Sequence, residues 1–112
     1  AGLVMGMFCA QILGVPFFAL LNKEESPQDS LGSKLSCSEE FVFCSKNIVN
    51  RPNYSAVIFN DFLISGSSIS NANTLLQKNG IKVSAALVLK DDPNYREQWQ
   101  KTLKEIPVIM LL

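Results

Sequence analysis

The order of apolar and polar residues predicts that strands alternate with helices through the second half of the chain. Residues 55–59 form a short apolar run, which is typical of a strand buried in a sheet. Residues 68–78 repeat apolar side chains at helical spacing, and Gly80 stands where such a helix ends. Strands separated by helices of this length predict βαβ units, and therefore an α/β fold around a parallel sheet. The elements expected after this helix are a strand at 83–89, a helix at 94–105 and a strand at 108–112.

The first half of the chain is less regular. Residues 4–13 are apolar on most sides and are followed by Gly14, which predicts a buried helix that ends there. Residues 15–21 form a continuous apolar run, as expected for a strand covered on both faces. The mostly polar stretch 25–54 predicts a long loop or hood segment. Short strand candidates within it lie at 41–44 and 47–49.

The length and the start of the chain bear on its domain organisation. A chain of 112 residues is long enough for one domain with a modest core. It begins directly in apolar sequence without an initiator Met, so we expect a single domain, 1–112, that lacks an N-terminal portion. This apolar start is interrupted by Gly6, Gln11, Gly14 and Pro16, which argues against a signal peptide or a membrane span.

Charge and composition exclude several classes of partner and active site. Hydrophobic residues make up 47% of the chain and charged residues 18%, as in globular proteins. Ten basic residues balance ten acidic ones without a long run of either sign, so neither nucleic acid nor a membrane is expected as a partner. The chain has no histidine, which removes a histidine base, a Ser-His or Cys-His pair and histidine metal ligands.

Cysteines and paired acids offer no metal site by their spacing. The three cysteines follow no zinc-binding pattern, and they predict a reduced, cytoplasmic protein. The acidic pairs Glu39-Glu40 and Asp91-Asp92 are typical of solvated loops rather than of metal-binding clusters.

The clearest candidate site is the polar segment after the strand at 55–59. Asn60 and Asp61 follow this strand directly, and Ser65-Gly66-Ser67-Ser68 opens the next helix. Parallel sheets bind ligands outside the carboxyl ends of their strands, and a glycine, hydroxyls and N–H groups at a helix start favour an anion. The alternative is purely structural: Ser67 or Ser68 caps the helix, and Asp61 is a turn residue. The residue pattern by itself leaves both interpretations open.

This segment resembles the binding motif for 5-phosphoribosyl-1-pyrophosphate (PRPP) in type I phosphoribosyltransferases. That motif is an apolar strand, two adjacent acidic residues, a short spacer, and Thr-Gly-Thr/Ser-Thr/Ser at a helix start. The resemblance implies a Rossmann-like type I phosphoribosyltransferase core, with a parallel sheet and helices on both faces. The matching residues are Ile58, Phe59, Asn60, Asp61, Ser65, Gly66, Ser67 and Ser68.

The resemblance also implies roles for individual residues. Asp61 and Asn60 would face the ribose of PRPP, and Lys23 would contact its pyrophosphate or the metal bound to it. The structural alternative for Lys23 is a solvated lysine at a strand end. Mg²⁺ would be bound through PRPP, with no side chain as a direct ligand. The loop that would bind the 5′-phosphate consists of Ile64, Ser65, Gly66, Ser67 and Ser68.

Weaker similarities extend to both sides of this motif. Residues 11–17 and 22–24 resemble the "L-G-x-P-F…R-K-E" of orotate phosphoribosyltransferases, and residues 78–83 resemble the "K-x-G-A-x-V" of the wider family. Residues 18–24 are also similar to a stretch of PRPP synthetase. The orotate branch is therefore the most similar one.

The chain departs from the family pattern at several charged positions. Asn60 replaces the first acidic residue, which removes a negative charge beside the ribose. The start of the chain, 1–4, keeps a glycine of the pyrophosphate loop but has neither its lysine nor its proline. Asn22, Ser26 and Gln28 stand where the orotate branch has Arg, Lys and His. Fewer cations would weaken the binding and departure of pyrophosphate.

The resemblance implies phosphoribosyl transfer from PRPP to a pyrimidine base, orotate, in nucleotide biosynthesis, by a homodimer. No residue is an obvious general base, which a reaction driven by leaving-group departure tolerates. The missing charges support an alternative, a weakened or inactive relative that binds PRPP or a nucleotide in a regulatory or structural role. A third interpretation is a PRPP synthetase-like assembly domain.

Overall fold

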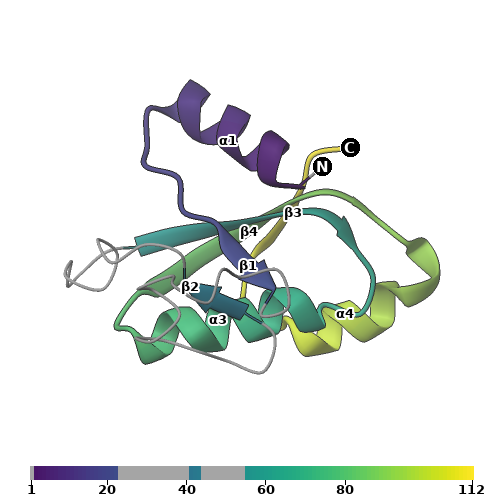
Figure 1. Cartoon of the computed structure of the whole chain (residues 1–112). Helices are drawn as coiled ribbons and strands as arrows, with labels where there is room; N and C mark the ends of the chain where they lie inside the picture. The colour runs from purple at the N-terminus through teal and green to yellow at the C-terminus, as the bar shows by residue number, and fades with distance from the viewer. Residues whose placement is uncertain (1, 23–40, 44–54) are drawn as a thin grey trace.

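A computed structural model describes residues 2–22, 41–43 and 55–112 of the chain (Figure 1). Of the strand candidates within the stretch 25–54, the one at 41–44 is confirmed as β2, and the one at 47–49 lies outside the described residues. The elements are α1 (Gly2–Leu13), β1 (Leu20–Asn22), β2 (Phe41–Phe43), β3 (Ser55–Leu63), α3 (Ser67–Lys78), β4 (Lys82–Asp91), the 3₁₀ turn η1 (Pro93–Tyr95), α4 (Arg96–Thr102) and β5 (Val108–Met110).

The second half of the chain forms a three-stranded parallel sheet in the order β3-β4-β5. Helix α3 connects β3 to β4, and α4 connects β4 to β5, so the two βαβ units expected from the sequence are present. Figure 1 shows α3 and α4 on one face of the sheet and α1 on the other. The predicted α/β fold, with a parallel sheet and helices on both faces, is confirmed.

Helix α3 forms because its apolar residues lie on one side. Ile69, Ala72, Leu75 and Leu76 are its buried residues, at the spacing that brings side chains onto one helical face. The helix ends at Lys78, and Ile81 N–H donates to the carbonyl of Leu76 at 3.0 Å, which closes the last turn.

The core consists of two clusters beneath the sheet. Leu75, Leu76 and Ile81 form the first cluster, against which Phe18 and Leu20 pack from the first half of the chain. The second cluster joins the end of β3 and the start of α3 to the sheet and α4. Its buried members are Leu63, Ile69, Ala86, Val88, Trp99 and Leu103.

Helix α1 differs from the buried helix that the sequence predicted. Only a narrow side faces the protein, where Gly6 and Ala10 are buried, and a Cβ at Gly6 would lie 2.9 Å from Cε2 of Phe17. Five of the described apolar side chains of this helix are exposed instead. The exposed ones are Val4, Met7, Phe8, Ile12 and Leu13. Because the sequence of α1 is apolar on most sides, it did not indicate which side of the helix would pack against the rest of the protein.

The strand predicted at 15–21 is also shorter than expected. Residues 15–19 have no regular secondary structure, and β1 begins at Leu20 and pairs antiparallel with β2. Val15 and Phe17 are exposed, so the apolar run does not form a strand covered on both faces.

The helix predicted at 94–105 divides into the turn η1 and the shorter helix α4. Pro93 begins the 3₁₀ turn, and the carboxylate of Asp92 accepts the Asn94 N–H at 3.0 Å. Trp99 and Leu103 lie in the core as expected, but Tyr95 belongs to the turn and is exposed. Among the described helices, none has the length and apolar character needed to cross a bilayer.

Candidate functional site

Loop 64–68, which runs from the end of β3 into α3, lies at the carboxyl edge of the parallel sheet. A buried residue holds the chain on each side of it. Leu63 before the loop and Ile69 after it are each 1% exposed and belong to the same core cluster. The loop is therefore short, and its two ends are fixed by packing.

Gly66 is required in this loop by its backbone and by its surroundings. It is the N-cap of α3, with a φ of 84°, a left-handed conformation that L side chains rarely adopt. A Cβ at this position would lie 3.1 Å from Cγ of Leu103 and 3.3 Å from Cβ of Trp99. The backbone at Gly66 therefore rests directly on helix α4.

Hydroxyl groups gather at the start of α3. The Oγ atoms of Ser65 and Ser67 lie 3.0 Å apart, and Ser67 N–H donates to Ser65 Oγ at 3.2 Å. Helix α3 begins at Ser67, and its N-cap is Gly66. The alternative in which Ser67 or Ser68 is the capping residue is therefore wrong. Three hydroxyls beside the positive end of a helix dipole can bind an anion.

Asn60 and Asp61 lie within β3, whereas the sequence placed them after the strand. The pairing with β4 continues through Phe62 to Leu63, because Leu63 packs into the core. Phe62 N–H donates to Oδ1 of Asp61 at 2.9 Å, and the Oδ1 of Asn60 lies 3.4 Å from the same nitrogen. Asp61 is thus a strand residue rather than a turn residue, two positions before the strand ends.

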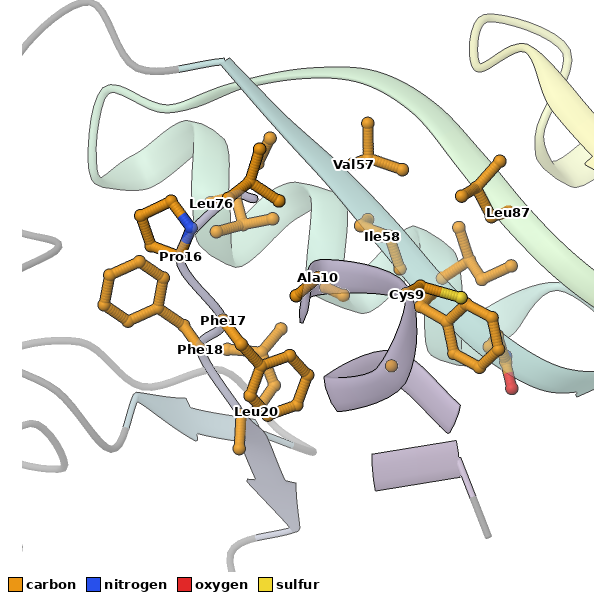
Figure 2. Close-up of a pocket in the computed structure, with 18 of the residues that line it drawn as sticks. Cys9, Ala10, Pro16, Phe17, Phe18, Leu20, Val57, Ile58, Leu76 and Leu87 are labelled. Carbon is orange, nitrogen blue, oxygen red and sulfur yellow. The ribbon is translucent and has the colours of Figure 1, made fainter. Parts of the chain in front are cut away.

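A cavity of about 690 Å³ lies between α1, residues 15–20 and β3. Figure 2 shows aromatic and aliphatic side chains around it, among them Phe17, Phe18 and Ile58. Its polar lining includes Asn60, Asp61 and Ser68, whereas most of the wall is apolar. Ser65, Gly66 and Ser67 do not line this cavity, so Ser68 is the one serine at the start of α3 that also borders it.

A charged cluster that the sequence did not predict lies at the end of β4. Asp91 is 6% exposed and accepts hydrogen bonds from Nε and Nη2 of Arg96, each at 2.9 Å, and from Nε1 of Trp99 at 3.0 Å. The bonds from Arg96, and then the bond from Trp99, lower the pKa of Asp91 to about 2. Its interpretation as a solvated loop acid is wrong, because these donors replace water around the carboxylate.

The remaining predicted site residues are placed as follows. Lys23, the expected cation on the pyrophosphate side, lies outside the described residues. Within residues 2–22, 41–43 and 55–112, no group of three His, Cys, Asp or Glu side chains could hold a metal ion. The described site therefore consists of loop 64–68 together with Asn60 and Asp61 near the end of the strand before it.

No protein-family model and no curated protein matches the chain. Its fold is similar to that of solved adenine phosphoribosyltransferases. The enzyme from Thermoanaerobacter pseudethanolicus matches with a TM-score of 0.75 and 22% identity over 98% of this chain and 62% of that one. The Saccharomyces cerevisiae enzyme, complexed with an imino-altritol bisphosphate and adenine, has a TM-score of 0.73 and 18% identity over 97% of this chain and 59% of that one.

A third match is the adenine phosphoribosyltransferase from Leishmania tarentolae, with a TM-score of 0.69 and 17% identity over 97% of this chain and 56% of that one. The chain thus spans less than two thirds of the length of these structures. At these identities the similarity establishes the fold, which is that of the type I phosphoribosyltransferases.

Proposed function

We propose that this chain binds PRPP and transfers its 5-phosphoribosyl group to a nucleobase. The observation that carries the proposal is the position of loop 64–68, a hydroxyl-rich helix start at the carboxyl edge of a phosphoribosyltransferase fold. The motif residues Asn60 and Asp61 stand beside it on the preceding strand. Ligands of open parallel sheets bind at this edge.

Loop 64–68 suits the 5′-phosphate of PRPP. The hydroxyls of Ser65, Ser67 and Ser68 and the first N–H groups of α3 can donate to phosphate oxygens. The two serine hydroxyls that now contact each other would turn to the ligand, at little cost because hydroxyl hydrogens rotate freely. The packing of Leu63 and Ile69 keeps these donors in place before the ligand arrives.

Asp61 and Asn60 suit the ribose. As the base nitrogen bonds to C1 of the ribose, the C1–O bond to pyrophosphate breaks and its electron pair leaves with pyrophosphate. The proton of the base nitrogen passes to pyrophosphate or to water. Positive charge develops on the ribose in between, which the Asp61 carboxylate stabilises and the Asn60 amide does not. No protein nucleophile and no redox partner is needed.

Mg²⁺ fits this site only as part of the substrate complex. The described residues offer no cluster of metal ligands, whereas Mg²⁺ commonly binds through substrate phosphates and one or two carboxylates. Asp61 and Asn60 would hold the ribose of that complex, and no side chain is proposed as a direct ligand of the ion. Bound there, the ion would neutralise charge on the departing pyrophosphate, together with Lys23.

Two bases are candidates for the acceptor, and each is favoured by a separate observation. The matched structures are adenine phosphoribosyltransferases, which makes adenine the first base to test. The Leu-Gly-Val-Pro-Phe segment at 13–17 resembles the orotate branch, which makes orotate the second. The described contacts include no base-recognition residue, so turnover with each base is the deciding measurement.

The protein is also proposed to form a homodimer, and the exposed side of α1 supports this. Helix α1 has one polar side chain other than cysteine, Gln11, and no charged one. Its outward apolar side chains would form a large exposed patch on a monomer, and such patches mark interfaces. The patch consists of Val4, Met7, Phe8, Ile12 and Leu13.

The test of the function has two stages. Calorimetric titration of PRPP, with and without Mg²⁺, measures binding, and release of pyrophosphate with adenine or orotate measures turnover. Binding with turnover supports the transferase. Binding without turnover favours the weakened, nucleotide-binding alternative, and absence of binding at millimolar PRPP contradicts both.

A further inference from the structure

We propose that Asp91, Arg96 and Trp99 are positioning residues, which hold loop 64–68 in the shape that receives the phosphate. This inference rests on the proposed function, because it assigns a task to side chains that support the loop. None of the three belongs to the PRPP motif. They come from the end of β4 and from α4.

The three side chains form one hydrogen-bonded unit. Arg96 binds both oxygens of Asp91 with two nitrogens, and the indole of Trp99 binds one of the same oxygens. The bidentate geometry fixes the orientation of the carboxylate as well as its position. The side chain of Asp91 is 7% exposed and that of Arg96 is 52% exposed, so the unit extends from the core to the surface.

Two contacts connect this unit to the loop. The backbone N–H of Asp92, the residue after Asp91, donates to the carbonyl of Leu63 at 3.0 Å, directly before the loop. Trp99 and Leu103 pack against Gly66, and a Cβ there would lie 3.1–3.3 Å from their side-chain atoms, which is tighter than ordinary van der Waals contact. The loop is therefore held at two places: at Leu63 by the bond from Asp92, and at Gly66 by the packing of Trp99.

Removing the carboxylate charge should shift the loop. In an Asp91→Asn variant, one oxygen becomes an NH₂ group, which cannot accept a hydrogen bond. At the Oδ2 position it breaks the bonds from Arg96 Nε and Trp99 Nε1, and at the Oδ1 position it breaks the bond from Arg96 Nη2. In both cases the remaining acceptor oxygen carries no negative charge. The hydrogen bond to the indole is then lost or weakened, and the side chain of Trp99, whose Cβ lies 3.3 Å from where a Cβ at Gly66 would be, is held less firmly. A displacement of about 1 Å in a positioned group can cost on the order of 100-fold in activity.

Asp92→Asn is the matched control. It makes the same change of charge at the neighbouring residue, and asparagine keeps the side-chain oxygen that accepts the Asn94 N–H. The backbone bond from Asp92 to Leu63 is unaffected. A difference between the two variants therefore reports the hydrogen bonds of Asp91 rather than the local charge.

The first measurement is hydrogen exchange of the backbone amides in the full chain without ligand. We expect the amides of 64–68 to exchange at least about tenfold faster in Asp91→Asn than in the wild type or Asp92→Asn. Equal loss of protection across the whole sheet would indicate a general stability role and would overturn the positioning role. So would unchanged exchange at 64–68 in the folded variant.

The second measurement is the affinity for PRPP by calorimetry. The dissociation constant should rise between about 10-fold and 100-fold in Asp91→Asn and stay within about twofold of the wild-type value in Asp92→Asn. Trp99 is the only tryptophan in the sequence, so its fluorescence should also shift when PRPP is added to the wild type. A wild-type affinity in Asp91→Asn contradicts the inference.

The test remains decisive if the first variant does not fold or if the wild type does not bind PRPP. If Asp91→Asn does not fold, Arg96→Gln removes the bidentate partner at a half-exposed position and should change exchange and affinity in the same direction. If the wild type itself does not bind PRPP, the proposed function fails. The exchange comparison then still decides whether Asp91, Arg96 and Trp99 hold the loop.

Discussion

At the scale of single residues, Gly66 illustrates how two constraints coincide at one position. Its φ of 84° favours glycine for any loop of this shape, and its close contact with α4 disfavours a side chain for a separate reason. The motif in the sequence identifies this glycine, but only the structure shows that Leu103 and Trp99 require it as well.

The two constraints on Gly66 can be separated by mutation. Gly80 also has a positive φ, 74°, but a Cβ there would meet no atom within 4 Å. Gly66→Ala and Gly80→Ala should each lose about 1–2 kcal/mol of unfolding free energy from backbone strain. Gly66→Ala should lose about 1–3 kcal/mol more from the clash. Urea denaturation measures this difference, and equal losses would contradict the packing of the loop on α4.

Asn60 provides a second prediction at this scale. Replacing it with aspartate restores the acidic pair of the motif, and the added charge stabilises positive charge on the ribose during transfer. We expect kcat to rise, on the order of 100-fold at most, with adenine or orotate as the acceptor. Asn94→Asp adds the same charge on an exposed turn and should leave kcat unchanged. A lower kcat in Asn60→Asp would argue against a ribose-facing role.

Individual residues could be predicted where neighbouring residues in the sequence carried the signal. The spacing of Ser65, Gly66 and Ser67 is a local pattern, and it located the loop correctly. Asp91 and Asp92 look alike in the sequence, yet only Asp91 is buried and bound by Arg96 and Trp99. That difference arises from how α4 packs on the sheet, which neighbouring residues do not encode.

At the scale of elements, the ion pair between Asp91 and Arg96 joins β4 to α4 and makes this junction sensitive to acid. The pKa of Asp91 falls from 3.8 to about 2, chiefly through Arg96. A lowered carboxyl pKa stabilises the fold above pH 3.8 and loses this contribution as pH falls toward 2. The half-exposed arginine lets salt screen part of the interaction.

The acid sensitivity can be measured by thermal melting. The melting temperature of the wild type should exceed that of Asp91→Asn above pH 4, and the gap should narrow between about pH 4 and pH 2. Asp92→Asn serves as the control and should show a smaller gap. A gap independent of pH would contradict a charged, paired Asp91 in the fold.

Helix α1 gives the second prediction for an element. Ile12 is 79% exposed on the apolar patch, and Ile12→Glu places a charge there without disturbing the core. If the patch is the dimer interface, this variant should sediment as a monomer while its melting temperature falls only through dissociation. Gln11→Glu adds the same charge at the polar residue of the helix and should keep the dimer. A wild-type monomer at micromolar concentration would contradict the proposed dimer.

Periodicity predicted some elements better than others. Helix α3 was located closely, because its apolar face repeats at helical spacing and Gly80 follows its end. Helix α1 and the stretch 15–19 were assigned to the interior, because apolar composition alone does not specify which side another element covers. Strand β3 continued past Asn60 and Asp61, because pairing with β4 outweighed their polarity.

At the scale of the whole molecule, the parallel sheet and the edge that carries loop 64–68 were both accessible from the sequence. The acceptor base could not be predicted from the sequence, because base recognition depends on side chains that are far apart in the chain. The sequence resemblance favoured orotate, whereas the matched structures are adenine phosphoribosyltransferases that extend well beyond this chain. The fold could therefore be predicted from the sequence, and the acceptor base could not.

The most direct test of this account is a calorimetric titration of PRPP into the wild type in the presence of Mg²⁺, repeated with Gly66→Ala. One PRPP should bind per chain, ribose 5-phosphate should compete with it through the shared 5′-phosphate, and binding should be weaker in Gly66→Ala. The absence of binding at millimolar PRPP, or equal affinity in the two proteins, would contradict loop 64–68 as the phosphate site.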